Sequence, residues 1–432
     1  MRVLLIGGGG REHALAWRFR RDDPGVDLIA APGNPGIAEL AECISIAATD
    51  LPGLARLALE LDVDLTVVGP EAPLALGIVD RFRAAGLAIF GPTRAAAEIE
   101  TSKAFAKQLM LEEGIPTARA EMHTVAADAK EAARRFGAPV VVKASGLAAG
   151  KGVIVCETLA QADGAIDDML AGTLFGAAGH EVLIEEFMEG EEISVFAITD
   201  GERFVLLPAL QDHKRLLDGD RGPNTGGMGA YLPVRLPQDA ARDIVGATLR
   251  GLARRGRPFT GLLYAGLMLT RDGAKVVEFN CRFGDPETQA LMPLLHMQPG
   301  LLDTMLRVAA GQRIEDADAA ASGPDGACVT TVLAAAGYPD SPRTGDTITL
   351  PAPEDGVMLF HAGTARDADG QLITAGGRVF AVSAVGSDTA DAGRRSSEYA
   401  ARIRFAGKQQ RSDIGWREIA REQDARARTA GN

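Results

Sequence analysis

Three absences in the sequence each exclude a class of protein. The 432 residues include four cysteines that are far apart and form no CxxC pair, so we expect reduced thiols and no disulfides. The six histidines show no HxxxH spacing, which argues against a zinc site. No apolar run approaches the roughly 20 residues that span a bilayer. The short apolar start at 1–6 is no secretory signal, so we expect a cytoplasmic chain without a membrane partner.

Positive charge is also in short supply. The chain has 45 lysines and arginines against 58 aspartates and glutamates, a formal net charge of −13. This average field repels nucleic acids, and no basic, aromatic-rich stripe offsets it. Hydrophobic residues make up 46% of the chain, which is ordinary for a globular protein with a large core. The length then suggests about two to four domains.

The first hundred residues predict an α/β domain of Rossmann-like type. Short apolar runs at 3–6, 28–31, 65–68 and 87–90 read as buried strands, and the stretches 12–20 and 51–61 read as helices between them. Strands that alternate with helices indicate a parallel sheet covered by helices on both faces.

The remainder predicts a mostly antiparallel α+β unit and a small β-rich unit. From residue 101 a capped helix runs to 113, and strands follow at 139–143, 153–156, 182–187, 193–199, 204–210, 264–270 and 275–279. Residues 315–325 look like a linker. After it come strands at 329–333, 347–350 and 378–385 and a closing helix rich in Ala and Arg. We place the domains at 1–100, 101–318 (with a lid at about 116–190) and 325–425.

The glycine loop 7–10 follows the first strand and opens a helix. Such a loop lets a phosphate approach the backbone at a helix N-terminus. A dinucleotide site is the tempting interpretation, but the last glycine of GxGxxG is missing and no acidic residue ends the second strand. A phosphate on a smaller substrate fits better, and a tight structural turn is the alternative.

A second glycine-rich loop, 146–152, lies between two strands and carries lysines. It lacks the Ser or Thr of a P-loop, and a strand follows it. Lys143 precedes it and Lys151 lies within it, so it could cover a nucleotide triphosphate as a lid. The alternative is an ordinary hairpin. Lys103, in the first turn of its helix, opposes the helix dipole, which suggests a task such as meeting a phosphate.

The stretch 276–283 carries the most specific local pattern. At strand period two, Glu278, Asn280 and Arg282 share one face, and apolar residues share the other. Two oxygen ligands beside a cation suit Mg²⁺, which also binds phosphates. A structural Glu–Arg pair is the alternative, and it leaves Asn280 unexplained. The loop 222–229, with Asn224 and Gly226, suits an anion or an amino acid.

Together these stretches resemble the glycinamide ribonucleotide synthetase family of ATP-grasp enzymes. The matching segments are 7–13, 32–36, 68–73, 102–103, 146–152, 211–215, 222–229, 278–288, 361–364 and 413–416. Several of these segments are weak signals of the family on their own. Together they are specific, and they span nearly the whole chain. The resemblance implies an N-terminal domain, an ATP-grasp core and a small C-terminal domain. Two departures stand out: Ser145 replaces an expected acidic residue, and 264–269 offers no further acidic metal ligand.

The resemblance also implies a reaction and a set of residues. ATP would be held by Lys103, Lys143, Gly150, Lys151, Gly152, Glu185, Glu186, Phe187, Met188 and Glu192, and Mg²⁺ or Mn²⁺ by Glu278 and Asn280. Arg282, Lys214 and Asp212 would position glycine and steady the transferred phosphoryl group. Gly8, Gly10, Arg11 and Glu71 would help to bind phosphoribosylamine.

In the implied reaction the glycine carboxylate attacks the γ-phosphate of ATP, and the amine of phosphoribosylamine then attacks glycyl phosphate. Such chemistry needs positioning and charge neutralisation more than a covalent nucleophile. We expect a monomer. The alternatives are a related ATP-grasp carboxylase, a nucleotide-binding module without turnover, and a dehydrogenase.

Overall fold

The N-terminal unit is a parallel sheet, as predicted. The computed structural model describes residues 1–146, 152–172, 180–235, 239–314 and 325–430. The five strands run in the order β3-β2-β1-β4-β5, and every neighbouring pair is parallel. Their bounds are β1 Arg2–Gly7, β2 Asp27–Pro32, β3 Glu42–Cys43, β4 Leu65–Val68 and β5 Ile89–Phe90. The short strand β3 was not predicted.

Helices surround this sheet and lead out of it. They are α1 Gly10–Asp22, α2 Leu51–Glu60, α3 Glu71–Ala75, α4 Ile78–Ala84 and α5 Arg94–Thr101, with a 3₁₀ turn at Ile37–Glu39. Helix α1 begins directly after the glycine loop, so its N-terminus faces the carboxyl end of β1. The α/β prediction for the first hundred residues is confirmed.

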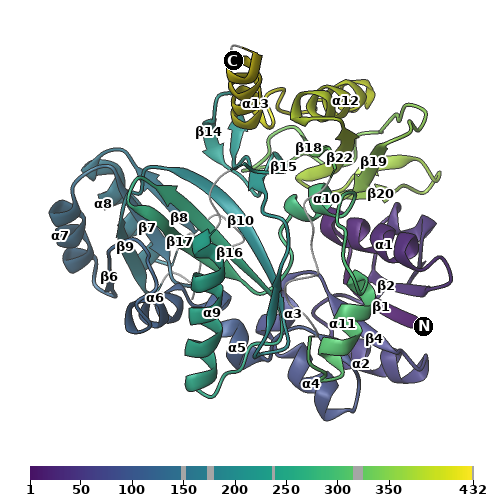
Figure 1. Cartoon of the computed structure of the whole chain (residues 1–432), viewed down its shortest axis with the longest axis horizontal. Helices are drawn as coiled ribbons and strands as arrows, with labels where there is room; N and C mark the ends of the chain where they lie inside the picture. The colour runs from purple at the N-terminus through teal and green to yellow at the C-terminus, as the bar shows by residue number, and fades with distance from the viewer. Residues whose placement is uncertain (147–151, 173–179, 236–238, 315–324, 431–432) are drawn as a thin grey trace.

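The next unit is a four-stranded antiparallel sheet that stands at one side of the molecule (Figure 1). Its order is β6-β9-β7-β8, with β6 Ala120–His123, β7 Val140–Ala144, β8 Val153–Cys156 and β9 Val182–Glu186. Helices α7 Ala126–Phe136 and α8 Leu159–Leu170 close a separate apolar core against it. Helix α6 Lys103–Glu112 is capped by the Ser102 hydroxyl, as predicted. Gly150 and Lys151 lie outside the described residues.

A second antiparallel sheet faces the first. Its order is β11-β10-β16-β17, with β10 Glu191–Thr199, β11 Phe204–Leu206, β16 Gly261–Thr270 and β17 Gly273–Asn280. The pairing of β16 with β17 shifts by one residue between Gly266 and Leu267. Helices α9 Asp239–Arg254, α10 Glu287–Leu291 and α11 Leu301–Ala309 complete this unit. The predicted strand at 204–210 is shorter than expected.

The third large sheet combines strands from two distant parts of the chain. Its order is β12-β15-β18-β22-β19, with β12 Gln211–Asp212, β15 Gly229–Leu232, β18 Ala327–Ala334, β19 Val357–His361 and β22 Arg378–Gly386. Strands β12 and β15 therefore pack with residues that follow the expected linker. Two small hairpins, β13 Arg215–Leu217 with β14 Arg221–Asn224 and β20 Thr364–Arg366 with β21 Leu372–Thr374, project from it.

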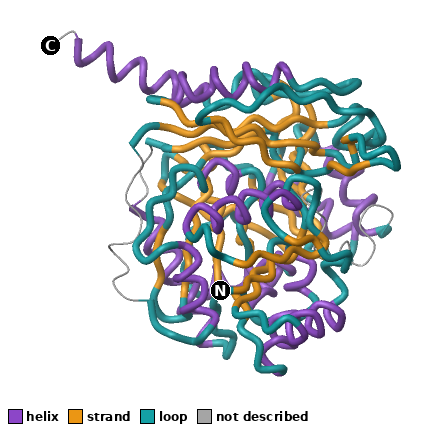
Figure 2. The backbone as a smooth tube through the Cα atoms, turned by 90° about the vertical axis from the view of Figure 1, so that its right-hand side faces the viewer, coloured by secondary structure: helices purple, strands orange, loops and turns teal. Residues whose placement is uncertain are grey.

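One predicted strand of the last unit is wrong. Residues 347–350 form no ladder, because Thr347 bridges to Ile373 while Thr349 bridges to Arg404, which lies elsewhere. Helix α12 Thr389–Arg402 and the expected closing helix, α13 Trp416–Ala430, complete the chain. Helix α13 lies along one end of the molecule, and its terminus projects away from the rest (Figure 2).

Candidate active site

Glu278 is surrounded by cations that come from four separate segments. It lies on β17, opposite Gly266 of β16. Burial raises the pKa of Glu278, but the charges of Lys214, Lys103, Lys143 and Arg282 outweigh it and hold that pKa below the ordinary value. The apolar partners on the other face of this segment, Phe279, Cys281 and Phe283, are buried, as the strand period predicts. The structure therefore gathers four of the predicted cations around the predicted metal-binding carboxylate.

Lys143 joins the two antiparallel sheets. Its Nζ donates to the Val277 carbonyl at 3.2 Å, next to Glu278, and lies 2.7 Å from Oε2 of Glu185. The other oxygen of Glu185 lies 2.9 Å from Nζ of Lys107. All three side chains are buried. Lys107 is a residue that sequence reasoning missed, because its partner lies on a strand far along the chain.

Lys103 lies at the start of α6, close to the end of β7. Its Nζ donates to the Gly146 carbonyl at 3.3 Å, and burial lowers its pKa. Ser145 joins the end of β7 to the helix: its carbonyl accepts from Lys103 N at 2.8 Å and its hydroxyl accepts from Ala104 N at 3.3 Å. Ser145 therefore has a structural role that fits its hydroxyl. Gly152 is buried, and its carbonyl accepts from Ala144 N at 2.8 Å.

The connector after β9 is more open. Glu186 pairs with Arg119 at 2.6 Å and with Lys275 at 3.6 Å, so its carboxylate is turned to the outer edge. Phe187 is 39% exposed, and Met188 is half-buried. An exposed aromatic ring on this connector is compatible with a base-binding edge.

Lys214 and Asp212 flank a buried histidine. Lys214 forms an ion pair with Glu192, and this partner together with Asp212 keeps the pKa of Lys214 well above its ordinary value against the effect of burial. Burial raises the pKa of Asp212 to about 8; Lys214 opposes this shift, and the nearby Glu287 and Glu192 favour it. A protonatable carboxyl and a cation thus lie side by side next to the Glu278 cluster.

Arg282 connects that cluster to the N-terminal unit. Its guanidinium lies 3.2 Å from Glu100 and 3.5 Å from Glu71, and it donates to Asn280 Oδ1 at 3.4 Å. Burial by itself lowers the pKa of Arg282, but the charges of Glu100 and Glu71 outweigh it and hold that pKa above the ordinary value. Glu100 also accepts a hydrogen bond from Cys281 N at 2.7 Å. Sequence reasoning missed Glu100, which lies on helix α5 with no local pattern to mark it.

The glycine loop after β1 closes against the same region. Arg11 donates to the Phe283 carbonyl at 3.1 Å and pairs with Glu12 at 2.6 Å. A side chain at Gly8 would lie 2.3 Å from the Gly33 carbonyl oxygen, and one at Gly10 would lie 2.6 Å from Gln289 Nε2. Gly8 therefore needs glycine, because a Cβ there meets backbone, whereas at Gly10 the end of the flexible Gln289 side chain would have to shift.

The loop 222–229 is divided between two environments. Asn224 is half-buried in the β13–β14 hairpin, opposite Arg215. Gly226 donates to the Tyr338 hydroxyl at 3.0 Å and accepts from Arg378, which also pairs with Asp285 at 3.3 Å. Gly226 is thus tied through Arg378 to Asp285, near Gly9 of the glycine loop, whereas Asn224 lies on the hairpin whose residues follow Lys214.

The chain matches three models of one family along its length. The phosphoribosylglycinamide synthetase N domain matches residues 1–100, its ATP-grasp (A) domain matches 101–288 and its C domain matches 328–417. The chain belongs to the phosphoribosylglycinamide synthetase family. A relative named phosphoribosylamine–glycine ligase from Xanthomonas campestris is 52% identical over 99% of this chain and all of its own length. The relative of that name from Salmonella typhimurium is 48% identical over 98% of this chain and all of its own length.

Solved structures agree with this assignment. A crystal structure of phosphoribosylamine–glycine ligase from Thermotoga maritima has a TM-score of 0.84 and 36% identity, and the match covers 96% of this chain and all of that one. A biotin carboxylase from Campylobacter jejuni has a TM-score of 0.71 at 16% identity over 95% of this chain and 92% of that one, which shows a shared fold only. As a member of the phosphoribosylglycinamide synthetase family, the chain is an ATP-grasp ligase.

The oxygen atoms of Glu278 and Asn280 suit a divalent metal that is bound together with the phosphates of a nucleotide. Glu278 and Asn280 offer a carboxylate and an amide oxygen from the same face of β17. Among the described residues, no cluster of three or more His, Cys, Asp or Glu side chains could hold a metal alone. In the same part of the chain, no helix is long and apolar enough to cross a membrane.

Proposed function

We propose that this chain joins glycine to 5-phosphoribosylamine at the expense of ATP, giving glycinamide ribonucleotide, ADP and phosphate. The observation that carries the proposal is the convergence of four cations on Glu278, within a chain of the phosphoribosylglycinamide synthetase family. Phosphoryl transfer is accelerated mainly by positioning and charge neutralisation. The conclusion places the chain in de novo purine biosynthesis.

The nucleotide lies between the two antiparallel sheets in this proposal. Lys103 and Lys143 contact the phosphates, with Gly150, Lys151 and Gly152 over them and 185–188 beside the base. Glu192 completes the set by binding ribose hydroxyls. Glu278 and Asn280 hold Mg²⁺ or Mn²⁺, which when bound neutralises the charge that develops on the phosphates.

The two substrates meet on opposite sides of Arg282. Lys214 and Arg282 bring the glycine carboxylate to the γ-phosphate, and Asp212 binds the glycine ammonium. Arg282 can make two parallel hydrogen bonds to oxygen pairs, which steadies the phosphoryl group and then the acyl phosphate. Gly8, Gly10, Arg11 and Glu71 bind phosphoribosylamine, and Asn224 and Gly226 add further substrate contacts. The amine of phosphoribosylamine attacks the acyl carbon of glycyl phosphate, and phosphate leaves.

The proposed organisation follows from the same reaction. We place the substrate domain at 1–100, the ATP-grasp core at 101–318 with its lid at about 116–190, and the C-terminal domain at 325–425. We also propose a monomer in the cytoplasm, where ATP is available. Sedimentation velocity with and without MgATP tests the monomer.

The reaction is tested by omitting one component at a time. Release of ADP should require ATP, a divalent metal, glycine and phosphoribosylamine together, and mass spectrometry should find glycinamide ribonucleotide. Full activity with bicarbonate in place of glycine would identify a carboxylase. Turnover of NADH without ATP would overturn the ligase assignment.

A further inference from the structure

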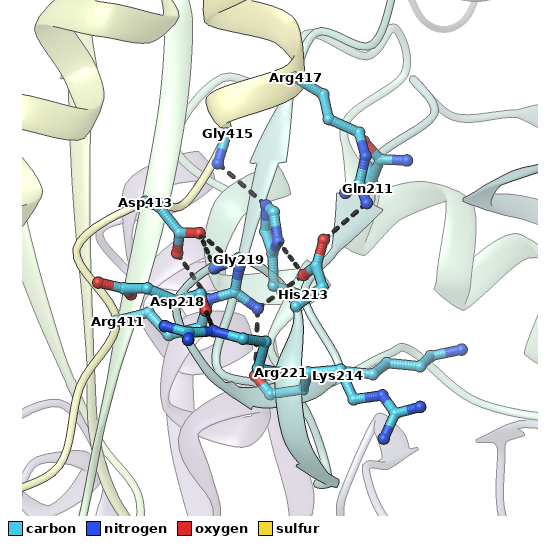
Figure 3. Close-up of polar contacts among 12 residues, drawn as sticks. Gln211, His213, Lys214, Asp218, Gly219, Arg221, Arg411, Asp413, Gly415 and Arg417 are labelled. Atoms are coloured by element: carbon cyan, nitrogen blue, oxygen red, sulfur yellow. Dashed lines mark hydrogen bonds and ion pairs between the residues drawn. The ribbon is translucent and has the colours of Figure 1, made fainter. Parts of the chain in front are cut away.

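The segment 413–416 matches the family but has no part in the reaction described above. It lies just before helix α13 and packs against the turn of the β13–β14 hairpin, next to the strand that carries Asp212 (Figure 3). His213 connects the segment 413–416 to the strand that carries Asp212. Since strand neighbours alternate, its side chain points away from the faces used by Asp212 and Lys214, and it is fully buried.

His213 is held by hydrogen bonds at both ring nitrogens. Nε2 accepts from the Gly415 backbone N–H at 3.0 Å, so Nε2 carries no proton. Nδ1 lies 3.4 Å from Asp220 Oδ1, which makes it the protonated nitrogen and the donor. Burial lowers the pKa of His213 and favours this neutral form. The ring therefore has one orientation, fixed from two distant segments.

Arg411 donates to the same oxygen of Asp220 that His213 contacts, while Arg417 donates to the other oxygen at 2.6 Å. The side chain of Arg411 is 0% exposed, and its guanidinium grips both carboxylate oxygens of Asp413, at 2.7 Å and 2.9 Å. One nitrogen reaches Asp220 Oδ1 at 2.8 Å and the Arg215 carbonyl at 3.1 Å. Arg215 directly follows Lys214. Arg411 thus fixes the backbone on the far side of Lys214, while His213 fixes it on the near side.

A second connection reaches the partner of Lys214. Arg421 of α13 pairs with Glu191 and donates to Glu418 at 2.7 Å. Glu191 precedes Glu192, the residue that pairs with Lys214. The carbonyl of Glu192 also accepts from Gln211 Nε2 at 2.7 Å. The C-terminal segment therefore holds the residues next to both members of the Lys214–Glu192 pair.

We propose that Arg411, acting through Asp220 and His213, is a positioning residue that sets where Asp212 and Lys214 stand toward glycine. Arg411 touches no substrate. Its contribution is to hold a short two-residue strand, β12, and the residues after it in one geometry. This inference rests on the proposed ligase function. A displacement of about 1 Å in such groups costs up to ~100-fold in rate.

The test compares Arg411→Met with Arg395→Met. Arg395 is a matched control because it also bridges backbone carbonyls in the C-terminal unit, those of Val385 and Asp355, away from Asp212. For parent and variants we would measure kcat and KM for glycine, the dissociation constant of MgATP by calorimetry, and the melting temperature. Arg411→Met should lower kcat by ~10-fold or more and raise KM for glycine, with MgATP binding unchanged. Arg395→Met should change only the melting temperature.

The outcomes separate the two proposals. An inactive parent overturns the ligase function and this inference with it. An active parent whose Arg411→Met and Arg395→Met variants have the same kinetics leaves the function standing and shows that Arg411 serves stability alone. If Arg411→Met does not fold, His213→Gln and His213→Phe carry the test. Gln keeps an acceptor for Gly415 N–H and should retain most of the glycine-dependent rate, which Phe should lose; equal kinetics overturn the inference.

Discussion

Nζ of Lys143 and Oε2 of Glu185 lie 2.7 Å apart, in a buried pair that Lys107 extends from the other carboxylate oxygen at 2.9 Å. Burial raises the pKa of Glu185, but Lys143 and Lys107 outweigh it and lower that pKa below the ordinary value. The sequence suggested that Glu185 binds ATP directly. The geometry makes it first a counterion that holds two lysines in place, one of which points to Glu278.

Glu185→Gln should therefore weaken both the fold and nucleotide binding. It leaves two buried ammonium groups without a counterion, which costs about 3–5 kcal/mol when a buried pair is broken. We expect a lower melting temperature and a larger dissociation constant for MgATP. The lowered folded-state pKa means that this stabilisation exists above the unfolded pKa and is lost as pH falls through the folded value. The variant should lose that acid dependence.

Glu131→Gln, on helix α7 and outside the proposed nucleotide site, is the matched control. Glu131 pairs with Arg135 at 3.3 Å, its side chain is 73% exposed, and such surface pairs contribute about 0–1 kcal/mol. Chemical denaturation and calorimetry at neutral and acid pH check both variants. If Glu185→Gln behaves like Glu131→Gln, the buried pair is not what orients Lys143.

Glu278→Gln should remove the metal-dependent step. The change keeps the size of the side chain but leaves Lys214, Lys103, Lys143 and Arg282 around a neutral amide, a poor ligand for a hard cation. We expect turnover to fall by ~100-fold or more, with partial recovery at high Mg²⁺ or Mn²⁺. The rise in melting temperature that MgATP gives the parent should also disappear.

Glu121→Gln, on β6 at the edge of the first antiparallel sheet, provides the comparison for Glu278→Gln. Its carboxylate is 39% exposed, pairs with the exposed Arg135 and lies 3.5 Å from the half-buried His123. Scanning calorimetry and ADP release are measured on both. Full activity of Glu278→Gln at ordinary metal concentration would falsify the metal assignment.

Local patterns allowed one face of the site to be predicted. Glu278 and Asn280 lie two apart on a strand, so the period alone places them together. Arg282 lies beside them as the same period predicts, donating to Asn280 Oδ1 at 3.4 Å, and its role toward the substrates stays a prediction. The partner that holds the Arg282 guanidinium in place was not predictable. Glu100 lies on helix α5, and no sequence spacing links Glu100 to Arg282 or to Cys281 N.

Long-range pairing explains the remaining gaps. Strand β12 has two residues and no signal of its own, and it forms only because β15 pairs with both it and β18. A sequence window cannot contain both partners. The failed strand at 347–350 has the opposite cause: its composition suits a strand, but its two bridges go to different segments.

Asp212→Asn should flatten the pH dependence of stability in the ligand-free protein. Burial raises the pKa of Asp212 to about 8, above its unfolded value. A raised folded-state pKa means that the folded protein binds a proton that the unfolded chain has released, so stability is greatest below the unfolded pKa and falls as pH rises toward 8. Asn has no proton to lose. Urea denaturation between about pH 5 and pH 8 measures the difference.

The exposed Asp272→Asn should keep the parent profile, since its side chain is 70% exposed and lies in a surface turn. Parallel profiles for the parent and Asp212→Asn would show that the Asp212 carboxyl is ionised throughout this range. In that case Lys214 dominates the electrostatics of the pair.

Gly266→Ala should disturb the site without disturbing the fold. Gly266 lies on β16 between Ser194 and Glu278, and a Cβ there would be 3.3 Å from Glu192 Oε1 and 3.5 Å from Glu278 Cγ. The added methyl group makes an ordinary contact with Glu278, but it requires the Glu192 carboxylate, which pairs with Lys214, to move away by a few tenths of an ångström. We expect ~10-fold lower turnover, because small displacements of positioned groups are costly.

Gly164→Ala on helix α8 is the control, since a Cβ there meets no atom within 4 Å. It should gain about 0.5–1 kcal/mol of stability and keep full activity. Steady-state kinetics and denaturation of both variants decide the matter: an unchanged Gly266→Ala enzyme would mean that the Glu192 carboxylate can move away freely, and that its position next to Gly266 does not limit the reaction.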